Sequence, residues 1–163
     1  MVAGGYLLSH TGRTAGGSLV CMKRILVCLD ASPRASFVLD TATDLAKRTG
    51  SKLVLLRTVG LPAEINQEMY VHSAENMADL LVNNAKKELA ALSSSVPAEL
   101  IEDLDVHIGI PWDTICREAK ERNVDLVILG SHGYSGLDRI LGTTAAKVVN
   151  HCDRSVYVAR PRA

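Results

Sequence analysis

Four glycines and four small hydroxyl residues lie close together between residues 130 and 144, a combination suited to binding phosphate. Glycine has no Cβ, so the backbone can approach an anion closely, and serine and threonine hydroxyls add hydrogen-bond donors. A helical pattern begins where the segment ends, so its last amides would point out of a helix N-terminus. The residues are Gly130, Gly133, Gly136, Gly142, Ser131, Ser135, Thr143 and Thr144.

The spacing matches neither of the two common phosphate-binding fingerprints. A Walker A loop needs Gly-Lys followed by Ser or Thr, and the dinucleotide fingerprint needs Gly-x-Gly-x-x-Gly after the first strand. This segment instead reads Gly-x-x-Gly-x-x-Gly and follows the fourth predicted strand. From the residues alone, a phosphate site and a tight strand-to-helix connection are equally compatible with it.

The side chains around this segment do not form a catalytic set. His132 is a candidate general base, but no nucleophile or second positioned acid accompanies it, so loop packing or phosphate contact is favoured. His151 and Cys152 are a candidate metal pair without further ligands nearby in the sequence. We therefore expect a binding site with no catalytic residue and no metal held by the protein.

Apolar runs and helical periodicity predict the elements that position the glycine segment. Strands are predicted at 25–29, 52–58, 104–108, 124–129 and 155–159, and helices at 34–48, 73–92, 111–122 and 143–151. Ser32 is the predicted N-cap of the first helix, with Pro33 in its first turn. Continuous apolar strands that alternate with helices indicate an α/β fold, a parallel sheet with helices on both faces. Ligands bind such sheets at the carboxyl ends of the strands, here 30–33 and 130–142.

Composition argues against several classes of partner. The 18 basic and 18 acidic residues balance and form no run of one sign, which gives no basis for binding nucleic acid. No apolar run approaches the roughly 20 residues needed to cross a membrane. None of the four cysteines, Cys21, Cys28, Cys116 and Cys152, forms a CxxC pair. Free thiols in a reducing cytoplasm are therefore expected rather than disulfides.

The first 21 residues differ in composition from the rest of the chain. They are rich in Gly, Ser and Thr and lack helical or strand periodicity. A secretory signal fits poorly, because the single basic residue, Arg13, follows the short apolar stretch 6–8 rather than preceding it. We interpret 1–21 as a disordered tail, with Met22 as an alternative start, followed by one domain over 22–163.

Five segments, in order along the chain, together resemble the universal stress protein family. They are ILVCLDAS from Ile25, LVLLRTV from Leu53, HIGIPWDTICREA from His107, GSHGYSGLDRILGTT from Gly130 and VYVARP from Val156. The resemblance covers Met22 to Pro161. It implies a single Rossmann-like domain, similar in architecture to adenine nucleotide α-hydrolases, with five parallel strands in the order 3-2-1-4-5.

The resemblance also implies a site for ATP or AMP, with Mg²⁺ accompanying the phosphates. In the nucleotide-binding branch of the family the loop reads Gly-x2-Gly-x9-Gly-[Ser/Thr]. Here eight residues separate Gly133 from Gly142, so the loop is one residue shorter. Asp30 is expected at the ribose and Thr58 at the adenine. The full implied set is Cys28, Asp30, Thr58, Gly109, Gly130, Ser131, His132, Gly133, Tyr134, Ser135, Gly136, Gly142, Thr143, Thr144 and Ala145.

The function implied by the resemblance is nucleotide-dependent regulation in a stress response, by a homodimer formed through Ser155–Ala159, rather than fast catalysis. An interaction dimer that binds no nucleotide is an alternative. An enzyme of the adenine nucleotide α-hydrolase type is disfavoured. Such enzymes place a Ser-Gly-Gly-x-Asp-Ser type of loop after the first strand, whereas Asp30 to Arg34 contains no glycine.

Overall fold

The computed structural model describes residues 22–60, 73–131 and 141–161, so the predicted tail at 1–21 lies outside the described residues. In the described part, strands and α-helices alternate, and one short 3-10 helix precedes the third strand. The elements are β1 (Arg24–Cys28), α1 (Ala35–Thr49), β2 (Lys52–Val59), α2 (Ser73–Ser93), η2 (Ala98–Leu100), β3 (Ile101–Ile108), α3 (Pro111–Glu121), β4 (Leu126–Gly130), α4 (Thr143–His151) and β5 (Ser155–Ala159).

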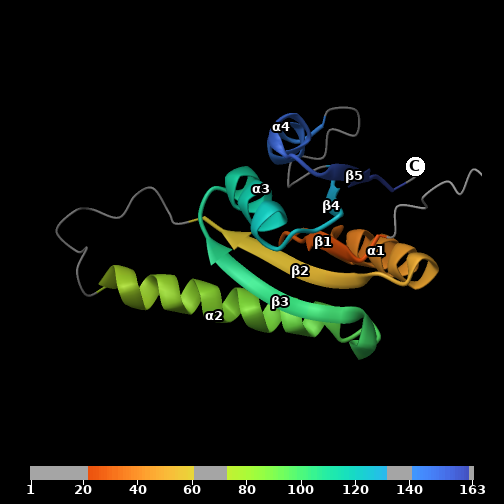
Figure 1. Ribbon diagram of the computed structural model, residues 1–163. Coiled ribbons are helices and arrows are strands. Elements are labelled where there is room, and N and C mark those ends of the chain that lie inside the picture. Colours follow the sequence, from red (N-terminus) through yellow and green to blue (C-terminus); the bar gives the residue numbers. More distant parts are fainter. Residues whose placement is uncertain (1–21, 61–72, 132–140, 162–163) are drawn as a thin grey trace, which may run out of the picture.

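The strands form one five-stranded parallel sheet in the order β3-β2-β1-β4-β5 (Figure 1). This confirms the predicted α/β class and strand order. Helices α1 and α2 pack on one face of the sheet, and α3 and α4 pack on the other. None of the helices in the described ranges is long and apolar enough to cross a bilayer.

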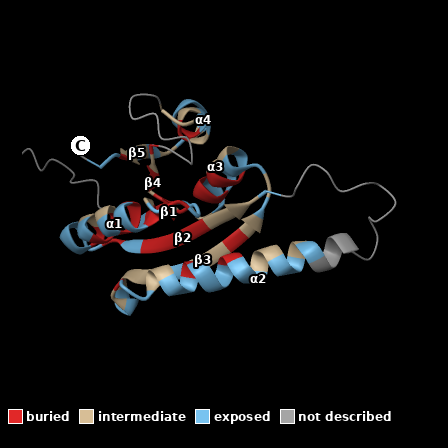
Figure 2. Cartoon of the chain, turned by 180° about the vertical axis from the view of Figure 1, so that it is seen from behind, coloured by how far each residue is buried: buried red, intermediate tan, exposed pale blue. Residues whose placement is uncertain are grey.

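Successive residues of the central strands belong to two different cores, because side chains alternate between the faces of a sheet. Ile25, Leu53 and Ile128 pack with α1 and α2, while Leu26 and Val127 pack with α3 and α4. All five side chains are fully buried. Burial on both faces explains why β1, β2 and β4 read as continuous apolar runs. Figure 2 shows the buried residues gathered along the sheet and on the helix surfaces that face it.

Several element boundaries differ from the prediction by one to three residues, and two of these differences have identifiable reasons. Strand β3 begins at Ile101, three residues before the predicted start, because its exposed Glu102 and Asp103 hide the strand from an apolar pattern. Helix α1 begins at Ala35 with Arg34 as N-cap and no side-chain capping bond, so the predicted Ser32 cap is wrong. Ser32 instead forms the preceding turn, where its Oγ accepts from the backbone N–H of Arg34 at 3.3 Å.

Asp125 ties the start of β4 to the start of β1. Its Oδ2 accepts hydrogen bonds from the backbone N–H groups of Lys23 at 2.7 Å and Arg24 at 2.9 Å. Its own backbone N–H donates to the Arg24 carbonyl at 3.0 Å. The bonds from Arg24 and Lys23 lower the pKa of the Asp125 carboxyl. One side chain therefore fixes the register of the two central strands at their amino ends.

Replacing Asp125 by Asn should lower the free energy of unfolding near pH 7 by about 1 kcal/mol, because a neutral amide accepts these bonds less strongly than a carboxylate. The native pKa lies below that of the unfolded chain, so the stabilisation is complete above about pH 4 and is lost as the pH falls through the native pKa. Urea unfolding should show the wild-type advantage near pH 7 and its loss in strong acid. The exposed Asp79 provides the control, since Asp79→Asn should have little effect. An advantage that persists in strong acid contradicts this account.

Candidate functional site

A cavity of about 540 Å³ opens at the carboxyl ends of β1, β2 and β4. Its volume is in the usual range for small-molecule sites. Strand β1 pairs with β2 on one side and with β4 on the other. The chain after β1 therefore runs toward one edge of the sheet, and the chain after β4 runs toward the opposite edge. The cavity therefore lies at the point where the strand order reverses, which is where open α/β sheets bind ligands.

The structure brings nine of the residues predicted for nucleotide binding around this one cavity. They are Cys28, Asp30, Thr58, Gly130, Ser131, Gly142, Thr143, Thr144 and Ala145. Their role in binding a nucleotide stays a prediction. The predicted residues His132, Gly133, Tyr134, Ser135 and Gly136 lie outside the described residues.

Gly109 is not among the described residues that line the cavity; Pro111, two residues later, is. The reason for a glycine at this position is local. Its φ is 157°, and a Cβ would lie 2.9 Å from Oγ1 of Thr114, a buried side chain. Its N–H donates to the Val59 carbonyl at 3.0 Å, which fixes the turn from β3 into α3. Gly109 thus shapes the turn that carries Pro111 to the cavity wall.

The N-terminus of α4 forms one end of the cavity. The Gly142 N–H donates to the Ser131 carbonyl at 2.8 Å, and the Ser131 N–H donates to the Ala159 carbonyl at 3.1 Å. The first bond joins the two ends of the glycine segment to each other, and the second ties Ser131 to β5. Helix α4 has no side-chain capping bond, and its first-turn amides at Thr143 and Thr144 have no acceptor within the helix. This end of the cavity therefore presents hydrogen-bond donors and the positive end of a helix dipole.

Asp30 lies at the cavity beside the start of α1. Its Oδ1 accepts from the backbone N–H of Ser32 at 3.0 Å, which closes a short turn after β1. A carboxylate has about four lone-pair sites, so Asp30 can hold this turn and still accept bonds from a ligand. The Asp30 side chain is exposed, so a polar ligand in the cavity can reach it.

The opposite end of the cavity is apolar and lies over β2 and α3. Leu56 of β2 and Ile115 of α3 line it there, and Leu129 of β4 and Val38 of α1 add apolar surface elsewhere in the cavity; sequence reasoning did not assign any of them to the site. Leu56 and Leu129 stand near the carboxyl ends of their strands on the face that α3 and α4 cover. The position of Leu56 and Leu129 late in the apolar runs could have identified them as lining residues. To predict Ile115 and Val38 as lining residues, one would need to know how α3 and α1 pack on the sheet, which the sequence does not show.

Thr58 lies at this apolar end and carries an unusual feature. Its Oγ1 is buried and has no hydrogen-bond partner among the described residues. A buried hydroxyl without a partner costs stability, so native proteins rarely keep one unless a ligand or water satisfies it. The hydroxyl is therefore a candidate contact for a polar group on the edge of a bound ligand.

The thiol beside the cavity is held in its neutral form near neutral pH. Burial, reinforced by the neighbouring Cys152 and Cys116, raises the pKa of the Cys28 thiol far above its ordinary value. Burial is also the main reason that the pKa of Cys116 is raised to about 11. Because the thiolate is the reactive form, both residues behave as small neutral side chains near neutral pH. Cys28 contributes surface to the cavity rather than chemistry.

The model of the "Universal stress protein family" matches residues 22–160, nearly the whole described chain. The chain belongs to this family. It is 33% identical over 150 residues to Universal stress protein YxiE of Bacillus subtilis, with 84% of this chain and 98% of that protein covered. The solved universal stress protein UspA from Lactobacillus plantarum has a TM-score of 0.71 and 26% identity, covering 85% of this chain and 98% of that one.

A universal stress protein solved in complex with cAMP shares the fold at a TM-score of 0.59 and 20% identity. The match covers 86% of this chain and 98% of that chain. Family membership and fold are thus shown by comparisons that span most of the chain.

Thr58→Val should raise the free energy of unfolding of the ligand-free chain by about 1 kcal/mol, since it replaces a buried, unpartnered hydroxyl by a methyl of similar shape. Thr58→Ser is the matched control. It keeps the hydroxyl and loses a methyl group, so it should lower the stability. Urea unfolding of the three proteins measures both effects. If Thr58→Val proves less stable than wild type, the hydroxyl has a partner and this account is wrong.

Proposed function

We propose that the cavity binds an adenine nucleotide, with ATP as the ligand, and that binding regulates a stress-response activity of the chain. The observation that carries the proposal is the division of the cavity into a donor-rich end at α4 and an apolar end over β2. A nucleotide has the same division, with phosphates at one end and a flat base at the other. Membership of the universal stress protein family supports it, as does the cAMP complex of a protein with this fold.

The geometry suggests how the nucleotide lies. Its phosphates would meet the amides and hydroxyls of Thr143 and Thr144 at the α4 N-terminus. Its ribose would lie over the end of β1, where Asp30 accepts from the sugar hydroxyls. The base would then reach β2 and α3, where Leu56 and Ile115 supply apolar surface. The unpartnered hydroxyl of Thr58 would bond the edge of the base.

Magnesium would accompany the phosphates rather than occupy a cage of protein ligands. Mg²⁺ keeps several of its waters and binds through phosphate oxygens and few side chains. Among the described residues that line the cavity, Asp30 is the single carboxylate. It lies beside β1, at the ribose position, so it does not serve as a metal cage for the phosphates.

Regulation rather than fast turnover fits the residues at the site. The lining thiol is neutral, and Asp30 is engaged in its own turn. Among the described lining residues, no side chain stands beside the α4 N-terminus as a base for activating water. The three described cysteines carry free thiols, in keeping with our proposal of a cytoplasmic location.

We further propose that the chain forms a homodimer through β5. This strand is an edge of the described sheet and pairs with β4. Tyr157 is 47% exposed there, and Val156 and Val158 are half-buried. An edge strand with exposed apolar side chains offers both backbone and side chains to a second copy.

Thr143→Glu should weaken binding of Mg-ATP by on the order of tenfold or more, because a negative charge would face the phosphates. The change should not unfold the chain, since Thr143 is exposed and a carboxylate at a helix N-terminus is favourable. Isothermal titration calorimetry with ATP, AMP and cAMP measures the affinities and their order. Ala91→Glu adds the same charge on the far face of the sheet, at an exposed position of α2, and should bind as wild type does. Equal affinities for the two variants would show that the phosphates do not bind at this end of the cavity.

Val158→Pro should convert the dimer to a monomer while leaving nucleotide binding intact. The Ala159 carbonyl bonds inward to Ser131, so by alternation the N–H of Val158 points to the free edge. Proline is tolerated on an edge strand when the lost N–H faces outward. Analytical ultracentrifugation gives the mass, and Val156→Thr, which keeps the backbone donor, is the control. If the wild-type chain is a monomer at high protein concentration, the dimer proposal is wrong, whereas the proposal of a nucleotide site is unaffected.

A further inference from the structure

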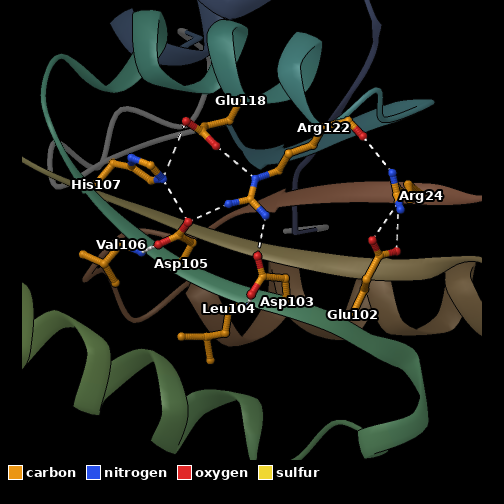
Figure 3. Close-up of polar contacts among 9 residues, drawn as sticks. All are labelled: Arg24, Glu102, Asp103, Leu104, Asp105, Val106, His107, Glu118 and Arg122. Atoms are coloured by element: carbon orange, nitrogen blue, oxygen red, sulfur yellow. Dashed lines mark hydrogen bonds and ion pairs between the residues drawn. The ribbon is translucent and has the colours of Figure 1, made fainter.

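A cluster of charged side chains fills the space between β3 and α3, away from the nucleotide cavity (Figure 3). Asp103, Asp105 and His107 are alternate residues of β3 and point towards α3, whereas Leu104 and Val106 point to the other side of the strand. Glu118 on α3 and Arg122, the C-cap of that helix one turn later, meet them from above. None of these residues lines the cavity, so the cluster has no part in the proposed nucleotide site.

Arg122 orients the carboxylates of this cluster. Its Nε donates to Oε2 of Glu118 at 2.9 Å, its Nη2 donates to Oδ2 of Asp105 at 2.5 Å, and its Nη1 donates to Asp103. The backbone N–H of Val106 donates to the other Asp105 oxygen at 2.8 Å. Two of the carboxylates, Asp105 and Glu118, are thereby fixed with one oxygen each turned towards His107.

His107 cannot satisfy both of these oxygens with a proton. Its Nε2 lies 3.0 Å from Oδ2 of Asp105 and 3.6 Å from Oε1 of Glu118. One N–H can make one good hydrogen bond, and 3.6 Å is beyond hydrogen-bond range. The other cation near Oε1, the half-exposed Arg117, is also 3.6 Å away. Glu118 is the most buried of the group, with 5% of its side chain exposed, and the cations nearest its Oε1, His107 and Arg117, both stand 3.6 Å away.

We propose that Asp105, His107 and Glu118 bind a zinc ion through Oδ2, Nε2 and Oε1. The three ligand atoms lie within 4.8 Å of one another. Zinc bonds to nitrogen and oxygen are about 2.0–2.2 Å, so ligand atoms at two corners of a tetrahedron are about 3.4 Å apart. The distances of 3.0 and 3.6 Å from Nε2 lie on either side of this value. A metal at the centre reaches all three atoms, which a single proton on Nε2 does not.

The surroundings of the triad have the other properties of a zinc site. The Nε of Arg122 bonds Oε2 of Glu118 and the Val106 N–H bonds Oδ1 of Asp105, so each orients a ligating carboxylate through its other oxygen, as outer-shell groups do in metal sites. Arg122 Nη2 also donates to Oδ2 of Asp105, the proposed ligand atom. Charge also favours a cation, since three carboxylates surround Arg122 at short range and Arg117 reaches only Glu118, at 3.6 Å. The side chains of His107 and Asp105 are 30% and 32% exposed, which gives zinc a route from solvent and leaves the fourth position for water. One histidine with two carboxylates suits zinc better than magnesium, which prefers oxygen alone.

Titration of the full chain with zinc chloride by isothermal calorimetry, under reducing conditions and without nucleotide, should show one saturable site. His107→Ala and Glu118→Gln should each weaken that site by about tenfold or more. Glu118→Gln keeps the shape of the side chain and an acceptor for Arg122, so it tests the ligand without removing the packing. Circular dichroism establishes that each variant is folded. Zinc should also raise the thermal midpoint of the wild type and not of the two variants.

His151 provides the matched control. It is a second histidine near a thiol and carboxylates, on a surface formed with Cys116, Asp113 and Asp153. His151→Ala should leave the zinc affinity unchanged. Cobalt in place of zinc should give a spectrum without a thiolate charge-transfer band. The proposal is overturned by the absence of a saturable site, by a thiolate band, or by folded His107 and Glu118 variants that bind zinc as tightly as wild type. The last result would identify the cluster as an ion-pair network alone.

Discussion

The reversal of strand order at β1 is the constraint on which the candidate site depends. Strand β1 pairs with β2 and with β4, so the connection after β1 and the connection after β4 leave the sheet on opposite faces. Between them the carboxyl ends of the strands cannot be covered by either helix layer. The cavity, Asp30 and the N-terminus of α4 all follow from this geometry. Because the strands are buried on both faces, apolar packing holds the ends of β1 and β4 in place.

What the cavity can do depends on how few reactive groups it contains. Its donors are backbone amides, hydroxyls and the guanidinium of Arg34, none of which serves as a base at neutral pH. Its thiol is kept neutral by burial, and its carboxylate is held in a turn. Among the described residues that line the cavity, no side chain stands at the α4 N-terminus as a general base, which agrees with our proposal of ligand binding. The same division of polar and apolar ends that favours a nucleotide therefore favours binding over chemistry.

The sequence predicted the strands and the position of the glycine segment because apolar runs and glycine spacing are local signals, whereas the strand order came from the family resemblance. Family resemblance added Asp30 and Thr58, and both line the cavity. It did not reveal Ile115 or Val38, whose part in the wall depends on how α3 and α1 pack. Nor did it show the start of β3, because Glu102 and Asp103 on an edge strand break the apolar pattern. The contact of His107 with Glu118 joins a strand to a helix, and periodicity within either element does not contain it.

The position of the charged cluster follows from β3 being an edge strand. Inward-pointing charges are one way in which sheets avoid pairing with other chains at an edge, and Asp103, Asp105 and His107 occupy such positions. The cluster nevertheless shares both of its elements with the cavity. His107 pairs in register with Thr58, and Glu118 lies one turn along α3 from Ile115, which lines the cavity. A change in how α3 is held at the edge of the sheet would therefore also move Ile115 in the wall of the cavity. A cation held between β3 and α3 would brace that wall from outside, without contacting the ligand that it helps to enclose.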